Sequence, residues 1–412
     1  EKKLGNTEFI LRLPSAIAGS ISIIMIFLVG KKLYEETEGI IAAILFSFSY
    51  TPIYFSQEAR SYSLLLLFTL ISTYFLLKLL EKDNAFGSIM YVLSIIITIY
   101  LHYFGLLILF LHGFIILYHC IISPLKRCYF FTIRLYAPVF IAYLPWIPFF
   151  LQHLKRGRIW IEEPRADAFI DFLLFNFNDS NLLTLVFIFL VAYSLIYTST
   201  KITHTDKLKC QKVSPAVILI LWIVIPFTTA FIKSQVSAPI LTNRNLIILL
   251  PAIYLLFARS ATIFVSSIGN IKKTKEIVFL SLSILLLWQT IGVKKYYSSP
   301  QKQQFREAVE YIITQDKRID GDSVIVGYAW SVDYFNYYFE KHQSSKRVSF
   351  IAGQKADIEN FANMIIKNAS PYIWYISAHK IPEQGFLDYL NNEFNLINTK
   401  DFLGAKVWLY KQ

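Results

Sequence analysis

The stretch Tyr54-Phe55-Ser56-Gln57-Glu58-Ala59-Arg60-Ser61-Tyr62 is a short polar island with a long apolar run on each side. It holds one carboxylate and one guanidinium. Ionisable groups at membrane depth cost several kcal/mol unless they face water, protein or a ligand. If the flanking runs cross a membrane, the island is therefore a candidate functional site at one membrane face.

The composition is that of a membrane protein. Hydrophobic residues make up 55% of the chain, charged residues 17%, and the mean hydropathy is +0.48. These values lie outside the usual range of soluble domains. The net charge of +12 indicates basic loops on one face of a bilayer rather than binding of nucleic acid, because the chain is so apolar.

Apolar windows that are long enough, or nearly long enough, to cross about 30 Å of hydrocarbon recur as far as Val293. They predict a polytopic α-helical membrane domain over residues 1–294 with about ten spans. Pro138, Pro145 and Pro148 lie in the sixth window and predict a kinked or broken helix. The windows are residues 13–29, 40–55, 63–80, 89–101, 104–122, 135–151, 182–197, 216–232, 246–264 and 277–291.

Alternation of the loops across the membrane divides the polar segments into two sets. The first set is rich in lysine and arginine, and the positive-inside rule makes it cytoplasmic. The second set contains the island, His102, residues 152–181, residues 233–244 and the C-terminal segment. We therefore predict a multi-pass protein of the cell (inner or plasma) membrane, with the island on the extracytoplasmic face. The basic set lies at residues 31–32, 78–82, 126–134, 201–212 and 272–275.

The three cysteines, Cys120, Cys128 and Cys210, lack the spacing of a metal or redox motif. The alternation places Cys128 and Cys210 on the reducing cytoplasmic side and Cys120 near it. We therefore expect neither a disulfide framework nor a zinc site.

The last segment, residues 295–412, has a different character. Helices are expected at residues 301–314, 332–340, 357–367 and 384–392, and strands at 323–327, 347–351, 372–377 and in a pair ending at 406–410. This alternation favours a small α/β domain with a mostly parallel sheet. The segment has no glycine-rich phosphate loop, so we assign it no nucleotide and interpret it as an extracytoplasmic cap.

Glu58 and Arg60 are the first candidates for chemistry. One interpretation places Glu58 in the first turn of the next helix, where acids are favoured, and Arg60 at lipid headgroups. Since residues two apart on a helix do not face each other, we expect no ion pair between them. Each then needs another partner, and we favour a functional site.

Two further motifs carry candidate residues. His102 and Tyr103 lie in the turn between the fourth and fifth windows, either as part of an interfacial aromatic belt or as a donor or metal ligand for phosphate. Asn243 and Arg244 precede the ninth window. An arginine on the extracytoplasmic side is unexpected under the positive-inside rule. A guanidinium binds phosphate bidentately, so Arg244 is a candidate for binding a lipid-linked phosphate. The alternative is that it contacts lipid headgroups. Residues 152–181, with Arg156, Arg158, Trp160, Glu162, Glu163 and Asp167, fit a carbohydrate-contacting, gating or solvated loop equally well.

Four motifs occur together in order: Leu4-Gly-Asn-Thr-Glu-Phe-Ile-Leu-Arg-Leu-Pro-Ser-Ala16, the island, residues 102–105 and residues 243–246. They resemble the prokaryotic branch of the dolichyl-phosphate-mannose–protein mannosyltransferase-like (GT-C) membrane glycosyltransferases, which includes the enzymes that transfer aminoarabinose to lipid A. The resemblance implies an inverting transfer of a sugar from a polyprenyl-phosphate donor to an acceptor hydroxyl of a protein, lipid or glycan at the external membrane face.

The resemblance also implies roles. Glu58 is the catalytic carboxylate, since an acceptor hydroxyl needs a base. Arg244 is the clamp for the departing phosphate, and the other substrate-binding residues are Arg60, His102, Tyr103 and Asn243. The chain is expected to lack the first span and the first external loop, which in the family carries the principal catalytic acid. The residues leave open whether a divalent metal assists.

Two other classes of protein stay open. A transporter or lipid flippase would line a path with the polar residues. It predicts inverted repeats and charges near mid-bilayer, whereas the charges here gather at the ends of the windows. A non-catalytic membrane scaffold would use its C-terminal domain to bind a partner.

Overall fold

The computed structural model describes residues 8–122, 128–155, 161–201, 214–268, 272–329, 331, 333–348, 359, 361–363, 365, 370–379 and 384–412. The chain divides into two compact units, Glu1–Lys294 and Lys295–Gln412. Each unit has its own hydrophobic core.

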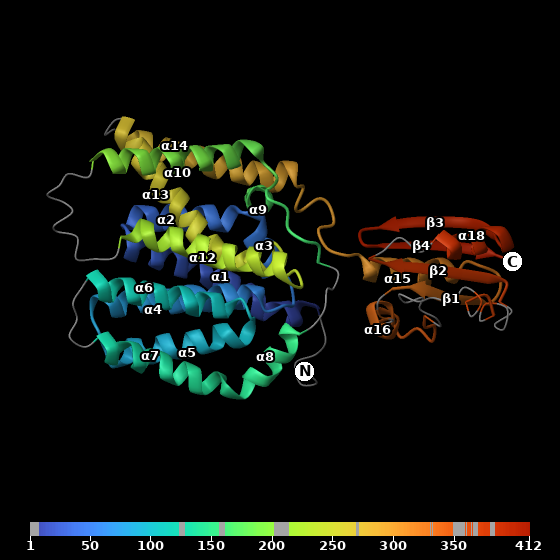
Figure 1. Cartoon of the computed structure of the whole chain (residues 1–412). Coiled ribbons are helices and arrows are strands. Elements are labelled where there is room, and N and C mark those ends of the chain that lie inside the picture. The colour runs from blue at the N-terminus through green and yellow to red at the C-terminus, as the bar shows by residue number, and fades with distance from the viewer. Residues whose placement is uncertain are drawn as a thin grey trace. The chain divides into compact units, whose positions relative to one another are not determined.

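The first unit is a bundle of helices (Figure 1). Among the described residues, seven helical segments are long and apolar enough to cross a membrane, and a bent pair of helices makes an eighth. Two shorter apolar helices, Ala85–Leu101 and Phe279–Val293, correspond to the fourth and tenth predicted windows. The predicted polytopic α-helical membrane fold is confirmed.

The helices of this unit are α1 (Glu8–Leu33), α2 (Glu36–Phe48), α3 (Tyr50–Ser56), α4 (Tyr62–Glu81), α5 (Ala85–Leu101), α6 (Gly105–Ile122), α7 (Cys128–Tyr143), η1 (Leu144–Trp146), α8 (Ile147–Leu154), α9 (Ala168–Asn176), α10 (Asn181–Lys201), α12 (Pro215–Val236), η2 (Asn245–Leu249), α13 (Leu250–Ile268), α14 (Lys272–Trp288) and η3 (Gln289–Val293). The predicted break in the sixth window is confirmed, because η1 with Pro145 separates α7 from α8.

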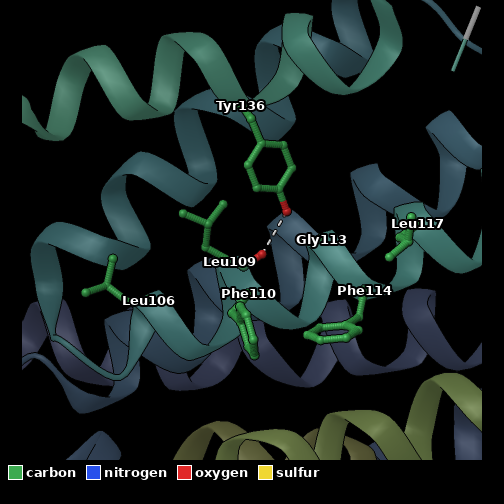
Figure 2. A pocket seen from close by; sticks show the side chains of 7 residues that line it. All are labelled: Leu106, Leu109, Phe110, Gly113, Phe114, Leu117 and Tyr136. Atoms are coloured by element: carbon green, nitrogen blue, oxygen red, sulfur yellow. Dashed lines mark hydrogen bonds between the residues drawn. The ribbon is translucent and has the colours of Figure 1, made fainter. Parts of the chain in front are cut away.

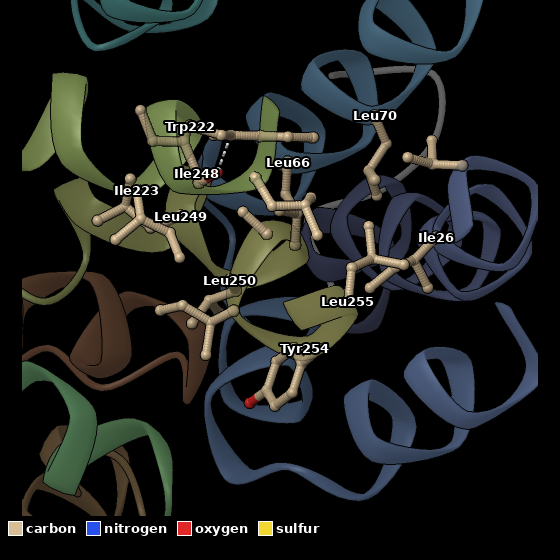
Figure 3. Close-up of a cluster of buried hydrophobic side chains, with 14 of the residues drawn as sticks. Ile26, Leu66, Leu70, Trp222, Ile223, Ile248, Leu249, Leu250, Tyr254 and Leu255 are labelled. Atoms are coloured by element: carbon tan, nitrogen blue, oxygen red, sulfur yellow. Dashed lines mark hydrogen bonds between the residues drawn. The ribbon is translucent and has the colours of Figure 1, made fainter. Parts of the chain in front are cut away.

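Helix α13 is the most buried of the spanning segments. A helix that is apolar all round is stable only when other helices surround it, and residues 246–255 are fully buried. Side chains of α1, α4 and α12 pack against it, including Ile26, Leu66 and Trp222 (Figure 3). The indole Nε1 of Trp222 donates a hydrogen bond to the carbonyl of Ile248 at 2.9 Å, which ties α12 to the 3-10 turn that begins this segment.

Glycines let α1 approach its neighbours closely, as small residues do between membrane helices. A Cβ atom on Gly30 would lie 2.7 Å from the Cα of Gly39 on α2, and one on Gly19 would lie 2.6 Å from the Cβ of Ser56 at the end of α3. Since Ser56 belongs to the polar island, this close packing positions the island against α1.

The span formed by α2 and α3 bends by 64° at Ser49. A break inside an apolar span frees backbone groups, and these must find partners in the protein. Asn178, in the turn between α9 and α10, supplies one: its Oδ1 accepts from the Tyr50 N–H at 3.2 Å, and its Nδ2 donates to Thr290 Oγ1 at 2.9 Å. Thr290 in turn donates to the carbonyl of Phe48 at 2.8 Å. One asparagine and one threonine thus stabilise the bend from both sides.

Replacing Asn178 by alanine should lower the free energy of unfolding by about 1–3 kcal/mol, because the Tyr50 N–H and the Thr290 hydroxyl lose buried hydrogen bonds. Thermal unfolding in detergent measures the change. The exposed Asn181→Ala variant is the control and should stay within about 0.5 kcal/mol of the wild type. Equal stability of the two variants would contradict the role given to Asn178.

The end of the bundle with the α1–α2 and α4–α5 connections carries the lysine-rich segments, and we call it the lysine-rich end. Cys120 and Cys128 are disulfide-bonded there, with Cα atoms 6.0 Å apart. The expectation of no disulfide was therefore wrong. The sequence separation of eight matches no motif, but the pairing follows from two antiparallel helices that bring the end of α6 beside the start of α7.

The second unit is a four-stranded sheet in the order β1-β2-β4-β3. Its strands are β1 (Ser323–Tyr328), β2 (Tyr372–Ala378), β3 (Asn395–Phe402) and β4 (Ala405–Lys411), and its helices include α15 (Phe305–Asp316), α16 (Asp333–Lys341) and α18 (Gln384–Glu393). Helices α15 and α16 pack on one face and α18 on the other.

The expectation of a mostly parallel sheet was wrong. Only β1 and β2 pair in parallel among the described strands, while β4 is antiparallel to β2 and to β3. The two-residue connection Leu403-Gly404, with Gly404 at φ +76°, forces β3 and β4 into a hairpin. The predicted strand at 347–351 and helix at 357–367 fall largely outside the described residues; residues 347 and 348 are not in a strand, and residues 359, 361–363 and 365 are helical.

Candidate functional site

The centre of the polar island, residues 57–61, is a turn and not part of a helix. Helix α3 ends at Ser56 and α4 begins at Tyr62. In this turn the Nε of Arg60 lies 3.4 Å from Oε1 of Glu58. The expectation that the two would not pair was wrong, because it assumed helical geometry. The Arg60 N–H donates a hydrogen bond to the Glu58 carbonyl at 2.8 Å. This tight turn brings the Glu58 and Arg60 side chains to the same side.

Two serines hold the island in place. Ser15 Oγ on α1 donates to the Arg60 carbonyl at 3.0 Å, and Ser61 Oγ donates to the Leu101 carbonyl at the end of α5 at 3.3 Å. The sequence pattern offered no sign of these contacts, since single serines near a helix end are common. The second bond places the island beside the turn that contains His102.

His102 follows the last residue of α5 and is half-buried. Its Nδ1 accepts a hydrogen bond from the Phe104 N–H at 3.2 Å, so the neutral ring carries its proton on Nε2. The ring lies 5.9 Å from that of Tyr62, the last residue of the island. Burial, and after it the positive charge of Arg244, lowers the pKa of His102 to about 4. His102 is therefore a neutral donor at physiological pH.

The connection from α5 to α6 is tight because of Gly105. A Cβ atom there would lie 2.3 Å from the Thr98 carbonyl of α5. Tyr103, in the middle of the connection, turns toward α8, where its ring lies 5.3 Å from Phe150 and 5.4 Å from His153. Tyr103 and His102 are adjacent in sequence, but their side chains contact different parts of the bundle.

Arg244 and Asn243 end the connection from α12 to η2, and both are half-buried. Ser234 Oγ accepts from the N–H groups of Ile240 and Leu241 at 2.9 and 3.0 Å, which fixes the course of this connection. Arg244 directly precedes η2, which packs against α4 and α12. Its effect on the pKa of His102 places the guanidinium near that ring.

An apolar groove lies between α6 and α7 (Figure 2). It has a volume of about 360 Å³ and runs along α6 from Leu106, four residues after His102, to Leu117. Gly113 leaves room in its wall, and the Tyr136 hydroxyl, which also lines it, donates to the Leu109 carbonyl at 2.8 Å. Sequence reasoning missed this groove, since it needs two helices placed side by side.

The remaining site predictions have mixed outcomes. Arg156, Arg158 and Trp160 lie outside the described residues, whereas Glu162, Glu163 and Asp167 are described and exposed. Within the described part of the chain, no group of three or more His, Cys, Asp or Glu side chains could hold a metal ion. The residues at this end that no pattern singled out are Ser15, Ser61 and Ser234.

Part of the chain also matches a known protein family by sequence. Residues 2–150, which include the island and His102, match the family model described as dolichyl-phosphate-mannose-protein mannosyltransferase. ArnT from Cupriavidus metallidurans bound to undecaprenyl phosphate superposes with a TM-score of 0.57 at 10% identity, over 99% of this chain and 85% of ArnT. The predicted resemblance is confirmed. Residues 2–150 are thus similar in sequence to this family, and the chain as a whole shares the GT-C fold of ArnT.

Two other matches agree with the GT-C fold. ArnT from Cupriavidus metallidurans in the apo state gives a TM-score of 0.57 at 9% identity, over 97% of this chain and 83% of ArnT. The archaeal oligosaccharyltransferase AglB from Archaeoglobus fulgidus, in complex with an inhibitory peptide and a dolichol-phosphate, gives 0.53 at 10% identity, over 97% of this chain and 63% of AglB. No curated protein matches the chain by sequence.

The lowered pKa of His102 predicts a pH dependence of stability. As the pH falls below about 6.5, the unfolded chain takes up a proton that the folded protein accepts only near pH 4. Between pH 7 and pH 5 the wild type should therefore lose about 2 kcal/mol more unfolding free energy than His102→Gln, which has no such group. Unfolding in detergent at both pH values measures this; identical losses in the two proteins would refute the buried neutral state.

Proposed function

We propose that this protein is a glycosyltransferase that moves a sugar from a polyprenyl-phosphate donor to an acceptor hydroxyl, with inversion, at the end of the bundle that holds the island. One observation carries the proposal. A guanidinium, Arg244, lies within electrostatic range of a neutral imidazole donor, His102, close to where an apolar groove begins. Solved structures with this fold hold undecaprenyl phosphate or a dolichol-phosphate, and this supports a donor of the same class.

The donor phosphate would be held by Arg244. A guanidinium offers parallel N–H donors that match phosphate oxygens, and it stabilises the charge that grows as the sugar leaves. His102 adds an Nε2–H donor without a charge of its own. Asn243, beside Arg244, and Arg60, on the island, would complete the binding of substrate, and Tyr103 would contact it from the α8 side.

Glu58 would act as the catalytic base toward the acceptor. Its side chain is 21% exposed, so a hydroxyl can reach it, and a carboxylate within hydrogen-bond distance of the hydroxyl accelerates its attack. Arg60 at 3.4 Å orients the carboxylate. The acceptor class, a protein, lipid or glycan, is set by surfaces outside this group of residues.

The polyprenyl chain would lie in the groove between α6 and α7. The groove is lined by leucine, phenylalanine and one tyrosine, and its length along α6 follows the direction in which a lipid chain enters the bilayer. An apolar chain gains about 25 cal/mol for each Å² removed from water, but little when it exchanges lipid for protein. The groove would therefore align the donor rather than supply most of the binding energy.

The end of the bundle that holds the island, which we call the site end, would face the extracytoplasmic side of the cell membrane. Lysines gather at the opposite end of the bundle, and the positive-inside rule makes that end cytoplasmic. We further propose that residues 295–412 form the extracytoplasmic domain, since they follow the last apolar helix on the site end.

Glu58→Gln should lower the rate of sugar transfer by about 10²- to 10⁴-fold, because the amide cannot accept the hydroxyl proton. The assay uses the full-length protein in lipid vesicles with a panel of polyprenyl-phosphate sugars. The exposed Glu162→Gln variant is the control and should transfer at the wild-type rate. Unchanged transfer by Glu58→Gln would remove Glu58 from the mechanism, and movement of donor across the bilayer with no transfer would favour a flippase.

Gly113→Leu should raise the KM for long-chain donors about tenfold, because the new side chain fills the groove and would push on the Tyr136 hydroxyl, 3.1 Å from an added Cβ. A donor with only two isoprene units should react normally. Ala192→Leu creates the same side chain at an exposed position of α10 and serves as the control. An equal effect on short and long donors would contradict the assignment of the groove to the polyprenyl chain.

A further inference from the structure

A second pocket lies at the lysine-rich end of the bundle, far from the candidate active site along the helices. It has a volume of about 220 Å³ and is lined by four helices. Each helix contributes near its end at this side: Lys32 on α1, Glu81 on α4, His119 on α6 and Pro215 on α12. Nothing in the proposed glycosyltransferase mechanism uses these residues.

His119 is the unusual member of this pocket. Its side chain is only 9% exposed, and it lines the cavity. In the part of the chain that the structure describes, its ring makes neither a hydrogen bond nor an ion pair. Its ring nitrogens are not among the buried atoms that lack a partner, so they are accessible from the cavity that the ring lines. A ligand in the pocket would supply the missing partner.

Lys32 and the start of α12 give this pocket a positive character. Lys32 forms an ion pair with Glu81, and an ammonium has three donors, so it can bind a second acceptor at the same time. Helix α12 begins at Pro215, which lines the pocket. The first N–H groups of a helix lack partners within it and favour anions, phosphate above all.

The other walls of the pocket are apolar, and they select the kind of phosphate. Leu33, Leu77, Leu80 and Ile218 line it. A free phosphate ion would make no favourable contact with these side chains, whereas the glycerol and the first acyl carbons of a lipid would pack on them.

We propose that this pocket binds the phosphate of a membrane phospholipid. The phosphate accepts hydrogen bonds from Lys32, from an N–H of the His119 ring and from the N-terminal turn of α12. The ion pair with Glu81 holds the Lys32 ammonium at the pocket. The bound lipid joins the ends of α1, α4, α6 and α12. This site is separate from the donor site and does not depend on the proposed transferase activity.

Native mass spectrometry of the full protein, released from detergent micelles, tests the proposal with phosphatidylglycerol as the probe. The wild type should retain one phospholipid, and Lys32→Gln or His119→Phe should lower the retained fraction about tenfold. His119→Phe keeps a ring of similar size and removes only the nitrogens, so folding is preserved. Lys31→Gln is the matched control, because Lys31 is adjacent but pairs with Glu36 at 2.8 Å; it should retain lipid like the wild type.

Two outcomes would overturn the proposal. Equal retention by wild type, Lys32→Gln and His119→Phe would show that the lipid binds elsewhere. Thermal stabilisation by millimolar inorganic phosphate, lost in Lys32→Gln and without any retained phospholipid, would assign the pocket to a free anion instead. Glu58→Gln should retain phospholipid normally, so a failure of the transferase assignment leaves this test unaffected.

Discussion

Backbone groups freed inside an apolar bundle must find partners in the protein, since lipid offers none. The helical unit meets this constraint at each irregular point. Asn178 and Thr290 satisfy the break between α2 and α3, and Trp222 satisfies the 3-10 turn that begins the α13 segment. Ser234 satisfies the connection that leads to Arg244. The connection held by Ser234 is also the one that carries Asn243 and Arg244, so there the same side chain stabilises the fold and positions candidate site residues.

The break in the α2–α3 span has the largest consequence for the proposed mechanism. It directs α3 toward α1, where Gly19 and Ser56 are in close contact, and Glu58 follows two residues after Ser56. A straight span would carry Glu58 into a regular helix, and its distance from Arg60 would then exceed that of an ion pair. The turn that follows α3 places Glu58 and Arg60 beside each other, next to the connection that holds His102.

The spans could be predicted from the sequence because hydropathy is a local property, and even the break at Pro145 followed from a local rule. The strands β1, β2 and β4 were predicted for the same reason. Strand direction in the C-terminal sheet, the Cys120–Cys128 pairing and the contact of Ser15 with the island depend on residues distant in sequence, and no single window contains them. The Glu58–Arg60 pair was missed for a different reason: the helical rule was applied to a turn. The cavity that His119 lines likewise depends on four helices that are distant in sequence.

The central claim is that the donor phosphate binds between Arg244 and His102, at the end of the groove along α6. Electron cryomicroscopy of the protein in nanodiscs with a polyprenyl phosphate tests this most directly. The account predicts phosphate density in contact with the Arg244 guanidinium and the His102 Nε2, with chain density passing Leu106 toward Gly113. Phosphate density at any other position with Arg244 and His102 unoccupied would contradict it.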